Sequence, residues 1–294
     1  MNLVAVDWGT SSLRGALLAA DGGVIEERSF ARGMLTIEKG HFPAVFESCF
    51  GDWILPGTFC LISGMGGSQQ GWAEAPYCPC PAGFADIAAQ LTWVQPARIA
   101  IVPGLSIDTS GIPDVMRGEE TQVFGALQLL GLTDARIALP GTHSKWVTVS
   151  DQTVTKFSTW MTGEFYALLR QHSILARTLP TEDTPQDDAA FDQGVAHALR
   201  SQSLLHTAFS VRTLSLFKAM TTDALSSYLS GLVIGEEIKY QQVKSGDSVV
   251  LIGADALTKK YKQALQQLGV HTQCVGNRAT WQGLRKIADM LNAP

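Results

Sequence analysis

The feature that most constrains the fold is a strand, a tight polar loop and a second strand near the start of the chain. An apolar strand predicted at 3–6 leads into Asp7-Trp8-Gly9-Thr10-Ser11-Ser12, and a second strand is predicted at 13–18. The Asp21-Gly22-Gly23 turn that follows favours a hairpin, because these residues accept positive φ angles. The loop therefore gathers N–H groups and hydroxyls on one side, which suits a phosphate group. An ordinary Ser/Thr-rich bend would contain the same residues.

The same order of features occurs a second time, which favours a functional loop. A strand predicted at 136–139 leads into Pro140-Gly141-Thr142-His143-Ser144, and further strands are predicted at 145–149 and 153–159. Two donor-rich loops with the same flanking strands indicate an internal duplication.

The first half is predicted to continue with a helix, two strands and a second helix. These elements are placed at 41–50, 58–63, 98–102 and 118–130. The proline-rich segment 76–81 and the mixed segment 104–117 are predicted to be loops. The run Gly64 to Trp72 is glycine-rich and could approach a ligand closely, although such a turn also occurs without a ligand.

The second half repeats this order with extra helices. A helix is predicted at 163–171 with Thr162 as its N-cap, and 181–193 is predicted to be an acidic, solvated loop. Gly231 and Gly235 lie four residues apart in a long helix, where they would let another backbone approach closely. The remaining elements are helices near 189–218 and at 223–242, a strand at 248–252, a helix at 256–268, a strand at 271–275 and a helix at 280–291. Each half thus has the order βββαβαβα.

Composition indicates a globular protein that does not bind nucleic acid or membranes. The chain has 294 residues, enough for two domains, with 46% hydrophobic and 17% charged residues. A net charge of −5 and the lack of a basic run argue against nucleic acid and anionic membranes. No apolar stretch approaches the roughly 20 residues that span a bilayer, and no signal peptide is expected. The five cysteines include Cys78-Pro79-Cys80, too close for zinc, and are interpreted as reduced thiols of a cytoplasmic protein.

The doubled order, with a phosphate-type hairpin opening each half, resembles the superfamily of actin, hexokinase and the heat-shock chaperone ATPases. Within it, four strings resemble the 2-dehydro-3-deoxygalactonokinase family: PGTHSKWV at 140–147, TWMTGEFYALL at 159–169, MRGEETQVFGAL at 116–127 and YLSGLVIGEEI at 228–238. The resemblance covers nearly the whole chain. It implies an α/β fold of two ribonuclease H-like βββαβαβα domains related by duplication, 1–112 and 113–294, with the active site in the cleft between them. It also implies that ATP phosphorylates the 6-hydroxyl of 2-dehydro-3-deoxy-D-galactonate.

The resemblance also assigns residues to ATP and Mg²⁺. Asp7 would orient Mg²⁺ through its waters, because magnesium dehydrates reluctantly. The strand at 249–252 with Gly253 and Ala254 would hold the adenosine. Arg14 and Lys145 would add positive charge, although either could equally be exposed surface. The phosphates would be bound by Gly9, Thr10, Ser11 and Ser12 in the first loop and by Gly141, Thr142, His143 and Ser144 in the second.

The general base is expected among the acids before the second hairpin. In the glycerol and xylulose kinases a Gly-Asp-Gln opens the corresponding helix and its Asp is the base. Gly118-Glu119-Glu120 occupies that place here, so the register assigns the base to Glu119, with Glu120 and Asp114 as alternatives. Acids at a helix start are also common for another reason, because they interact favourably with the helix dipole.

The sugar acid needs directional partners for its hydroxyls and a cation or helix start for its carboxylate. Ser68, Gln69 and Glu164 are suitable for the hydroxyls. Trp72 and Trp160 could form the pocket floor, although tryptophan is more often core. For the carboxylate the candidates are Arg32, Arg117 and the helix start after Thr162.

Two other functions fit the same residues. One is a kinase of the same fold that acts on 2-dehydro-3-deoxy-D-gluconate, the 4-epimer, or on another sugar or sugar acid. The other is a non-catalytic nucleotide-dependent switch. A sugar-sensing regulator is disfavoured, because no residues remain for a DNA-binding domain. The expected partners are ATP and a keto sugar acid, and a homodimer is compatible with the sequence.

Overall fold

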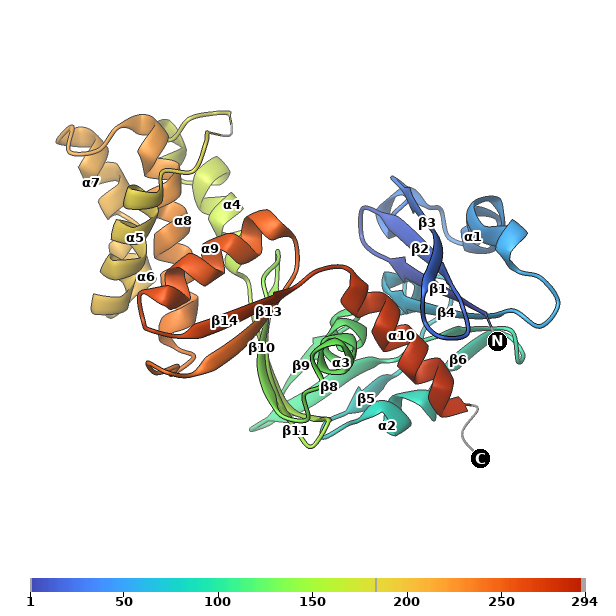
Figure 1. Cartoon of the computed structure of the whole chain (residues 1–294). Coiled ribbons are helices and arrows are strands. Elements are labelled where there is room, and N and C mark those ends of the chain that lie inside the picture. Colours follow the sequence, from blue (N-terminus) through green and yellow to red (C-terminus); the bar gives the residue numbers. More distant parts are fainter. Residues whose placement is uncertain (1, 183, 292–294) are drawn as a thin grey trace. The chain divides into compact units, whose positions relative to one another are not determined.

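The computed structural model describes residues 2–182 and 184–291. Packing divides the chain into two compact units, whose elements are labelled in Figure 1. Unit 1 consists of Met1–Ile137, Val147–Ser158 and Val275–Pro294, and unit 2 of Ala138–Trp146 and Thr159–Cys274. The domains predicted at 1–112 and 113–294 follow the sequence repeat and not the packing, so that division stays a prediction.

Unit 1 contains a six-stranded sheet with the order β3-β2-β1-β4-β7-β6. Its strands are β1 (Leu3–Trp8), β2 (Leu13–Leu18), β3 (Val24–Phe30), β4 (Phe59–Gly64), β6 (Thr92–Gln95) and β7 (Ile99–Ile101). The predicted hairpins are confirmed, since β1, β2 and β3 pair antiparallel and Gly22 has a φ of 86°. β4 pairs parallel with β1, which places the ends of both strands side by side.

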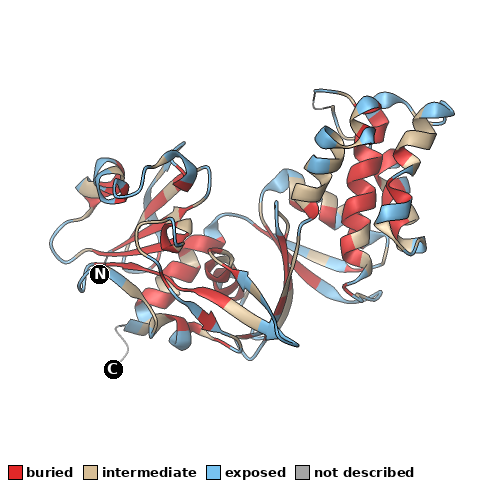
Figure 2. Cartoon of the chain, turned by 180° about the vertical axis from the view of Figure 1, so that it is seen from behind, coloured by how far each residue is buried: buried red, intermediate tan, exposed pale blue. Residues whose placement is uncertain are grey.

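The helix α1 (Phe42–Phe50) confirms another prediction and covers this sheet. Phe42, Phe46 and Cys49 are buried on one face of α1, and Trp8 packs against Phe42 with ring centroids 5.2 Å apart. The short 3₁₀ helices η1 (Met34–Thr36), η2 (Gly51–Trp53) and η3 (Met65–Gly67) complete this side of the unit. Figure 2 shows buried positions in α1.

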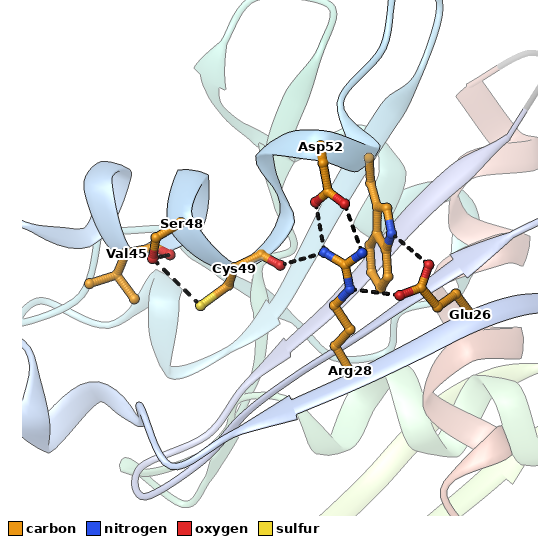
Figure 3. A network of polar contacts seen from close by, with 7 residues as sticks. Glu26, Arg28, Val45, Ser48, Cys49 and Asp52 are labelled. Atoms are coloured by element: carbon orange, nitrogen blue, oxygen red, sulfur yellow. Dashed lines mark hydrogen bonds and ion pairs between the residues drawn. The ribbon is translucent and has the colours of Figure 1, made fainter.

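Arg28 links β3 to the end of α1, as Figure 3 shows. Its Nη1 and Nη2 donate to the Asp52 carboxylate at 2.7 Å, and its Nε donates to Glu26 at 2.8 Å. The guanidinium also lies 4.2 Å from the centre of the Trp53 ring. Exposed ion pairs usually stabilise little, so we attribute the role of Arg28 mainly to covering Trp53 and fixing the geometry of this corner.

The loops predicted at 76–81 and 104–117 are wrong in part, because these segments contribute strands to a second, three-stranded sheet. Its order is β5-β8-β9, with β5 at Tyr77–Pro79, β8 at Gly104–Thr109 and β9 at Ile112–Met116. β8 and β9 join through Ser110 and Gly111, whose φ angles are 58° and 81°. The helix α2 (Phe84–Ala88) and the strand β6 were not predicted either.

Two helices from distant parts of the sequence pack closely in unit 1. They are α3 (Glu119–Leu130) and α10 (Arg278–Leu291), and both confirm predicted helices. A Cβ on Gly125 would lie 1.7 Å from the Ala279 carbonyl oxygen, and one on Gly283 would lie 1.9 Å from that of Thr121. Only glycine allows backbones to approach this closely.

A five-stranded sheet with the order β12-β11-β10-β13-β14 follows in the sequence. Its strands are β10 (Ala135–Leu139), β11 (Ser144–Ser150), β12 (Thr153–Trp160), β13 (Ser248–Ile252) and β14 (His271–Val275), and α9 (Asp255–Gln266) connects the last two. The order corresponds to β3-β2-β1-β4-β7 of the first sheet. The repeated order confirms the predicted α/β class with a duplicated topology.

Helices make up most of the rest of unit 2, and α8 is buried along most of its length (Figure 2). The elements are α4 (Thr162–His172), η4 (Ile174–Arg177), α5 (Asp188–Arg200), α6 (Leu204–Thr207), α7 (Ser210–Leu216) and α8 (Thr222–Lys239). The predicted close approach at Gly231 and Gly235 is confirmed, because α5 packs against both. The loop predicted at 181–193 ends earlier, since Asp187 caps α5 by accepting a hydrogen bond from Ala190 N at 2.9 Å.

Three further findings concern the cysteines, metal-binding groups and membrane-spanning helices. The five cysteines are free, as predicted. Within 2–182 and 184–291, no group of three or more His, Cys, Asp or Glu side chains is arranged to hold a metal ion. In the same residues no helix is both long and apolar enough to cross a membrane.

Candidate active site

Asp7 and Arg14 form an ion pair at the end of β1. The antiparallel register places Asp7 opposite Arg14, and Arg14 Nη2 donates to Asp7 Oδ2. The Asp7 side chain is 14% exposed and that of Arg14 28% exposed. Arg14 is therefore directed to the loop and is not a solvated surface residue, the alternative that the sequence left open.

The loop after Asp7 presents backbone donors. Gly9 N donates to Ser12 O at 2.8 Å, which closes a tight turn. The carbonyl oxygens of Gly9 and Thr10 accept hydrogen bonds from the N–H groups of Met34 and Leu35, which attach the loop to η1. In the described part of the chain, the N–H groups of Thr10 and Ser11 donate no hydrogen bond. Thr10 and Ser11 are exposed, so these groups can reach an anion.

Gly64, the last residue of β4, brings the start of α3 close to Asp7. Gly64 has a φ of 88°, and a Cβ on it would lie 2.7 Å from Trp8 O and 3.4 Å from Asp7 Oδ1. A Cβ on Gly118, which has a φ of 106°, would lie 3.2 Å from Gly64 Cα. Asp7 and the N-terminus of α3 therefore both lie against Gly64.

The three candidate bases differ in their surroundings. Glu119 is half-buried, and its Oε2 accepts a hydrogen bond from Arg117 N at 3.0 Å. Glu120 is fully buried, and burial together with the charge of Glu119 raises the pKa of Glu120 to about 8. Asp114 lies in β9, where its Oδ1 accepts from Val115 N at 2.7 Å. Of the two glutamates that open α3, only Glu119 is open to solvent.

Ser68, Gln69 and Trp72, predicted to bind the sugar acid, lie in the glycine-rich loop itself. Trp72 N donates to Gly66 O at 2.8 Å, and Ser68 Oγ contacts Met34 Sδ at 3.2 Å. Gln69 is exposed, whereas Trp72 packs against Phe46 at 5.3 Å between ring centroids. Trp72 is thus largely part of the core.

The two arginines considered for the carboxylate differ. Arg32 is exposed and donates to Ser48 Oγ at 3.0 Å. Arg117 lies 4.2 Å over the Tyr77 ring, and its Nη2 donates to Ala75 O at 2.8 Å. Its Nε and Nη1 are buried without a hydrogen-bond partner among the described residues.

The second polar loop, in unit 2, contacts the start of α4. A Cβ on Gly163 would lie 2.6 Å from Gly141 O, and Glu164 N donates to Thr142 O at 3.1 Å. His143 Nε2 and Glu164 Oε2 form a hydrogen bond. Thr142 and His143 are exposed beside this helix N-terminus, a favourable place for an anion.

Ser144 and Lys145 are directed into the unit instead. Ser144 Oγ lies 3.0 Å from Tyr261 OH, and Lys145 Nζ donates to Thr159 Oγ1 at 2.7 Å. Both residues are buried, so the exposed position considered for Lys145 does not occur.

A buried carboxylate that was not predicted supports this loop. Glu237 of α8 is 1% exposed and accepts hydrogen bonds from Trp146 Nε1 at 2.6 Å, from Tyr261 OH at 2.7 Å and from Thr162 Oγ1. The predicted N-cap is wrong by one residue, because α4 begins at Thr162 and its N-cap is Met161, while the Thr162 hydroxyl donates to Glu237. A glutamate within the apolar string YLSGLVIGEEI was the available signal.

Two adjoining cavities lie among α4, α8 and α9. Gly253, at the end of β13, is next to the second loop, since a Cβ on it would lie 3.5 Å from Pro140 O. One cavity has a volume of about 160 Å³ and the other about 490 Å³, and they share Tyr166 and Lys260. The smaller is mainly apolar and is lined by residues that include Gly141, Val233, Ile234, Leu257 and Tyr261. Trp160 and Ala254 do not line either cavity, and Trp160 stacks on Tyr240 at 5.7 Å.

The repeated sheet order and the polar loop after the first strand of each half define the class as the actin-like ATPase fold. The activator of the 2-hydroxyisocaproyl-CoA dehydratase from Clostridium difficile, solved with bound ADPNP, shares the fold with a TM-score of 0.51. It is 11% identical and the match covers 99% of this chain and 96% of that one, so the likeness concerns the fold alone.

The chain belongs to the 2-keto-3-deoxy-galactonokinase family, whose family model matches residues 7–287. It is 38% identical over 292 residues to a protein of Rhizobium meliloti (strain 1021) named a probable 2-dehydro-3-deoxygalactonokinase, covering 97% of this chain and 95% of that one. It is 35% identical over 288 residues to the 2-dehydro-3-deoxygalactonokinase of Escherichia coli (strain K12), covering 97% of each. A crystal structure of a protein from Sinorhizobium meliloti, described there as a putative 2-dehydro-3-deoxygalactonokinase, has a TM-score of 0.91 and 37% identity to this chain. The match covers 98% of this chain and 99% of that one. The family resemblance found in the sequence is thereby confirmed.

Proposed function

We propose that this protein is an ATP-dependent kinase that phosphorylates the 6-hydroxyl of 2-dehydro-3-deoxy-D-galactonate. The observation that carries the proposal is membership of the family over nearly the whole chain, with full-length relatives named for this activity. The geometry of each unit supports it, because phosphoryl transfer mainly requires anion-binding loops, cations and a positioned base.

The nucleotide is assigned to the second polar loop and the cavities beside it. The N-terminus of α4 with Thr142 and His143 would bind the β- and γ-phosphates. Gly141 lines the smaller cavity, so the cavity adjoins the loop that would bind the phosphates, and its Val233, Ile234 and Leu257 would contact the base. Apolar lining with a few polar groups is usual for such a pocket.

The transferred phosphoryl group is assigned to the first loop, with Asp7 as the residue that orients Mg²⁺. The free N–H groups of Thr10 and Ser11 are donors for a phosphoryl oxygen. The partly exposed Asp7 carboxylate fits a magnesium ion held mainly through water, since one carboxylate is a common protein contribution to such a site. Bound Mg²⁺ would neutralise developing negative charge, and Arg14 adds a positive charge at the same place.

Glu119 is assigned as the general base that accepts the proton of the 6-hydroxyl. It is the accessible carboxylate at the start of α3, and the contact of Gly118 with Gly64 places that start beside Asp7. Glu120 is fully buried and Asp114 lies on β9 instead of at the start of α3, so neither is as well placed as Glu119 to accept the proton.

Arg117 is assigned to the substrate carboxylate. A guanidinium with buried N–H groups that lack acceptors has unused capacity for a charge-assisted hydrogen bond. Gly67 lies against Arg117 Nη1, so the glycine-rich loop has to shift for a ligand to reach that nitrogen. Ser68 and Gln69 lie on the same loop and would bind substrate hydroxyls.

The test is an ADP-release assay with both epimeric keto acids, followed by NMR location of the phosphate in the product. We expect ADP with 2-dehydro-3-deoxy-D-galactonate and a phosphate on its 6-oxygen. A higher kcat/KM for 2-dehydro-3-deoxy-D-gluconate would replace the proposed substrate by its epimer. A product phosphorylated at another oxygen would contradict the proposed chemistry.

A further inference from the structure

The two adjacent glutamates that open α3 have different environments. Glu119 is half-buried, whereas Glu120 is 0% exposed. In the described part of the chain, no nitrogen of Lys, Arg or His lies within 4 Å of the Glu120 carboxyl group to form an ion pair with it. A buried carboxylate normally requires a cation or several donors.

The Glu120 carboxyl group belongs to a closed ring of hydrogen bonds. Its Oε2 accepts from Gly118 N at 2.6 Å, and its Oε1 lies 3.5 Å from Ser63 Oγ. Ser63 Oγ lies 3.0 Å from Thr121 Oγ1, and the Thr121 hydroxyl donates to Gly118 O at 2.7 Å. The ring joins the end of β4 to the first turn of α3.

The number of hydrogens in this ring determines the state of Glu120. Its three oxygen–oxygen contacts need three hydrogens, but the hydroxyls of Ser63 and Thr121 supply only two. Gly118 O can only accept, so the Thr121 hydrogen is committed to it. If Glu120 were ionised and Ser63 donated to Thr121 at 3.0 Å, no hydroxyl hydrogen would remain for Glu120 Oε1. If Ser63 donated to Glu120 instead, the 3.0 Å contact with Thr121 would oppose two lone pairs. A hydrogen on Glu120 Oε1 completes the ring, with Glu120 donating to Ser63 and Ser63 donating to Thr121.

We infer that Glu120 is a positioning residue that acts as a neutral carboxylic acid and fixes the Gly118-Glu119 turn against the end of β4. The inference rests on the proposed function only in taking Glu119 as the base whose position is fixed. The Gly118 N–H bond to Glu120 holds a glycine with a φ of 106°, and Glu119 is the next residue.

The surrounding charges agree with a neutral group. Burial and the charge of Glu119 raise the pKa of Glu120 to about 8, and hydrogen bonds from the backbone N–H groups of Glu120 and Gly118, followed by the charge of Arg117, oppose the shift. β4 contributes the hydroxyl of Ser63 to this environment, and the backbone of Gly283 in α10 lies against the neighbouring Thr121. At neutral pH the folded protein therefore keeps a proton here that the unfolded chain releases.

The sign of the pH dependence follows from this difference. The folded pKa is raised above the ordinary value of 4.5, so the stability that the bound proton contributes is fully present below about pH 4.5, decreases as the pH rises, and is lost once the pH has passed through about 8. Glu120→Gln removes the titration but keeps the ring, because its amide can accept from Gly118 N and donate to Ser63 Oγ. Other titrating groups are common to both proteins and cancel in the comparison.

The experiment compares the wild type with Glu120→Gln, Glu120→Ala and Glu119→Gln. Thermal melting is measured without nucleotide or divalent cation from about pH 6 to about pH 9, and kcat and KM are measured near pH 7. We expect the melting temperature of the wild type to fall relative to that of Glu120→Gln as the pH rises. We expect Glu120→Gln to keep kcat within about threefold, and Glu120→Ala to lose more than about tenfold in kcat with a smaller change in KM.

Two results would overturn the inference. One is a melting-temperature difference between wild type and Glu120→Gln that does not change with pH. The other is a loss of kcat in folded Glu120→Gln as large as in Glu119→Gln, which would assign the base to Glu120. If even the wild type failed to phosphorylate the keto acid, the proposed function would fail, whereas the melting comparison would still test the proton on Glu120. That comparison also holds if Glu120→Ala does not fold.

Discussion

Two buried glutamates in this protein have opposite surroundings. Glu237 receives hydrogen bonds from an indole, a phenol and a threonine hydroxyl, so its oxygens act as acceptors. Burial raises the pKa of Glu237, and these donors counteract the shift. The Glu120 carboxyl group accepts hydrogen bonds from backbone N–H groups of its own turn and makes one long contact, to Ser63 Oγ. Glu237 therefore supports the second loop as a hydrogen-bond acceptor. By our inference, Glu120 supports the start of α3 as a hydrogen-bond donor.

The role of Glu119 leads to a kinetic prediction. Glu119→Gln keeps the shape of the side chain but cannot accept the substrate proton, so we expect kcat to fall by about 10²–10⁴-fold with little change in ATP affinity. Steady-state kinetics and ATP titration measure the two quantities. Asp114→Asn is the matched control and should keep its kcat. If Glu119→Gln turned over at the wild-type rate, another acid would be the base.

The role of Arg117 leads to a different pattern. Lysine keeps the charge of Arg117 but loses the planar set of donors, so Arg117→Lys should raise KM for the keto acid by at least about tenfold. KM for ATP should not change. The matched control is Arg32→Lys, in which both KM values should stay close to those of the wild type. A raised KM for the keto acid in the Arg32 variant alone would assign the carboxylate to Arg32.

At the scale of elements, α5 and α8 pack through glycines rather than through side chains. A Cβ on Gly231 would lie 2.1 Å from Phe191 O, and one on Gly194 would lie 2.2 Å from Tyr228 O. Backbone atoms cannot move aside as a flexible side chain can. The small residues therefore fix the distance between the two helices, and α8 in turn carries Glu237 and one wall of the cavities.

This packing predicts the effect of a single methyl group. Gly231→Ala should reduce the free energy of unfolding by about 1–3 kcal/mol, because the helices have to separate. Gly276→Ala is the control, since a Cβ there meets nothing within 4 Å. Chemical denaturation measures both variants. Equal stability of the two would contradict the close contact of α5 with α8.

Elements with a strong local signal could be predicted from the sequence. The strands β2, β13 and β14 have the predicted bounds, and the runs of β2 and β13 are mainly apolar and are followed by a turn or a glycine. The hairpin of β8 and β9 could not be recognised, because many of its side chains are exposed and its strands lack a clear alternation. The residue after the predicted strand 153–159, Trp160, stacks on Tyr240 from a distant part of the chain, a contact that no local pattern contains.

The candidate site was predictable to a similar degree. Asp7, Arg14 and the exposed loop residues Thr142 and His143 follow from local sequence patterns. The contacts of Glu237 and the cavity residues Ser226, Ser230 and Lys260 depend on α4, α8 and α9 meeting in space. The register favoured Glu119 over Glu120 as the base, but the difference in burial between the two glutamates is visible only in the fold.

At the scale of the whole molecule, the two units contribute different parts of one proposed reaction. Unit 1 contains the ion pair of Asp7 with Arg14, the glutamates that open α3 and the glycine-rich loop. Unit 2 contains the second loop and the two cavities. A kinase needs both sets to act on two substrates, whereas a nucleotide-dependent switch needs no sugar acid. Dependence of ATP turnover on the keto acid therefore separates these two functions.

The most direct test of the central claim is the rate of ADP release from ATP and Mg²⁺ with and without 2-dehydro-3-deoxy-D-galactonate. We predict rapid ADP release only when the keto acid is present, with one phosphorylated sugar acid formed for each ADP. Slow ADP release at a rate that the keto acid does not change would contradict the kinase and favour a nucleotide-dependent switch.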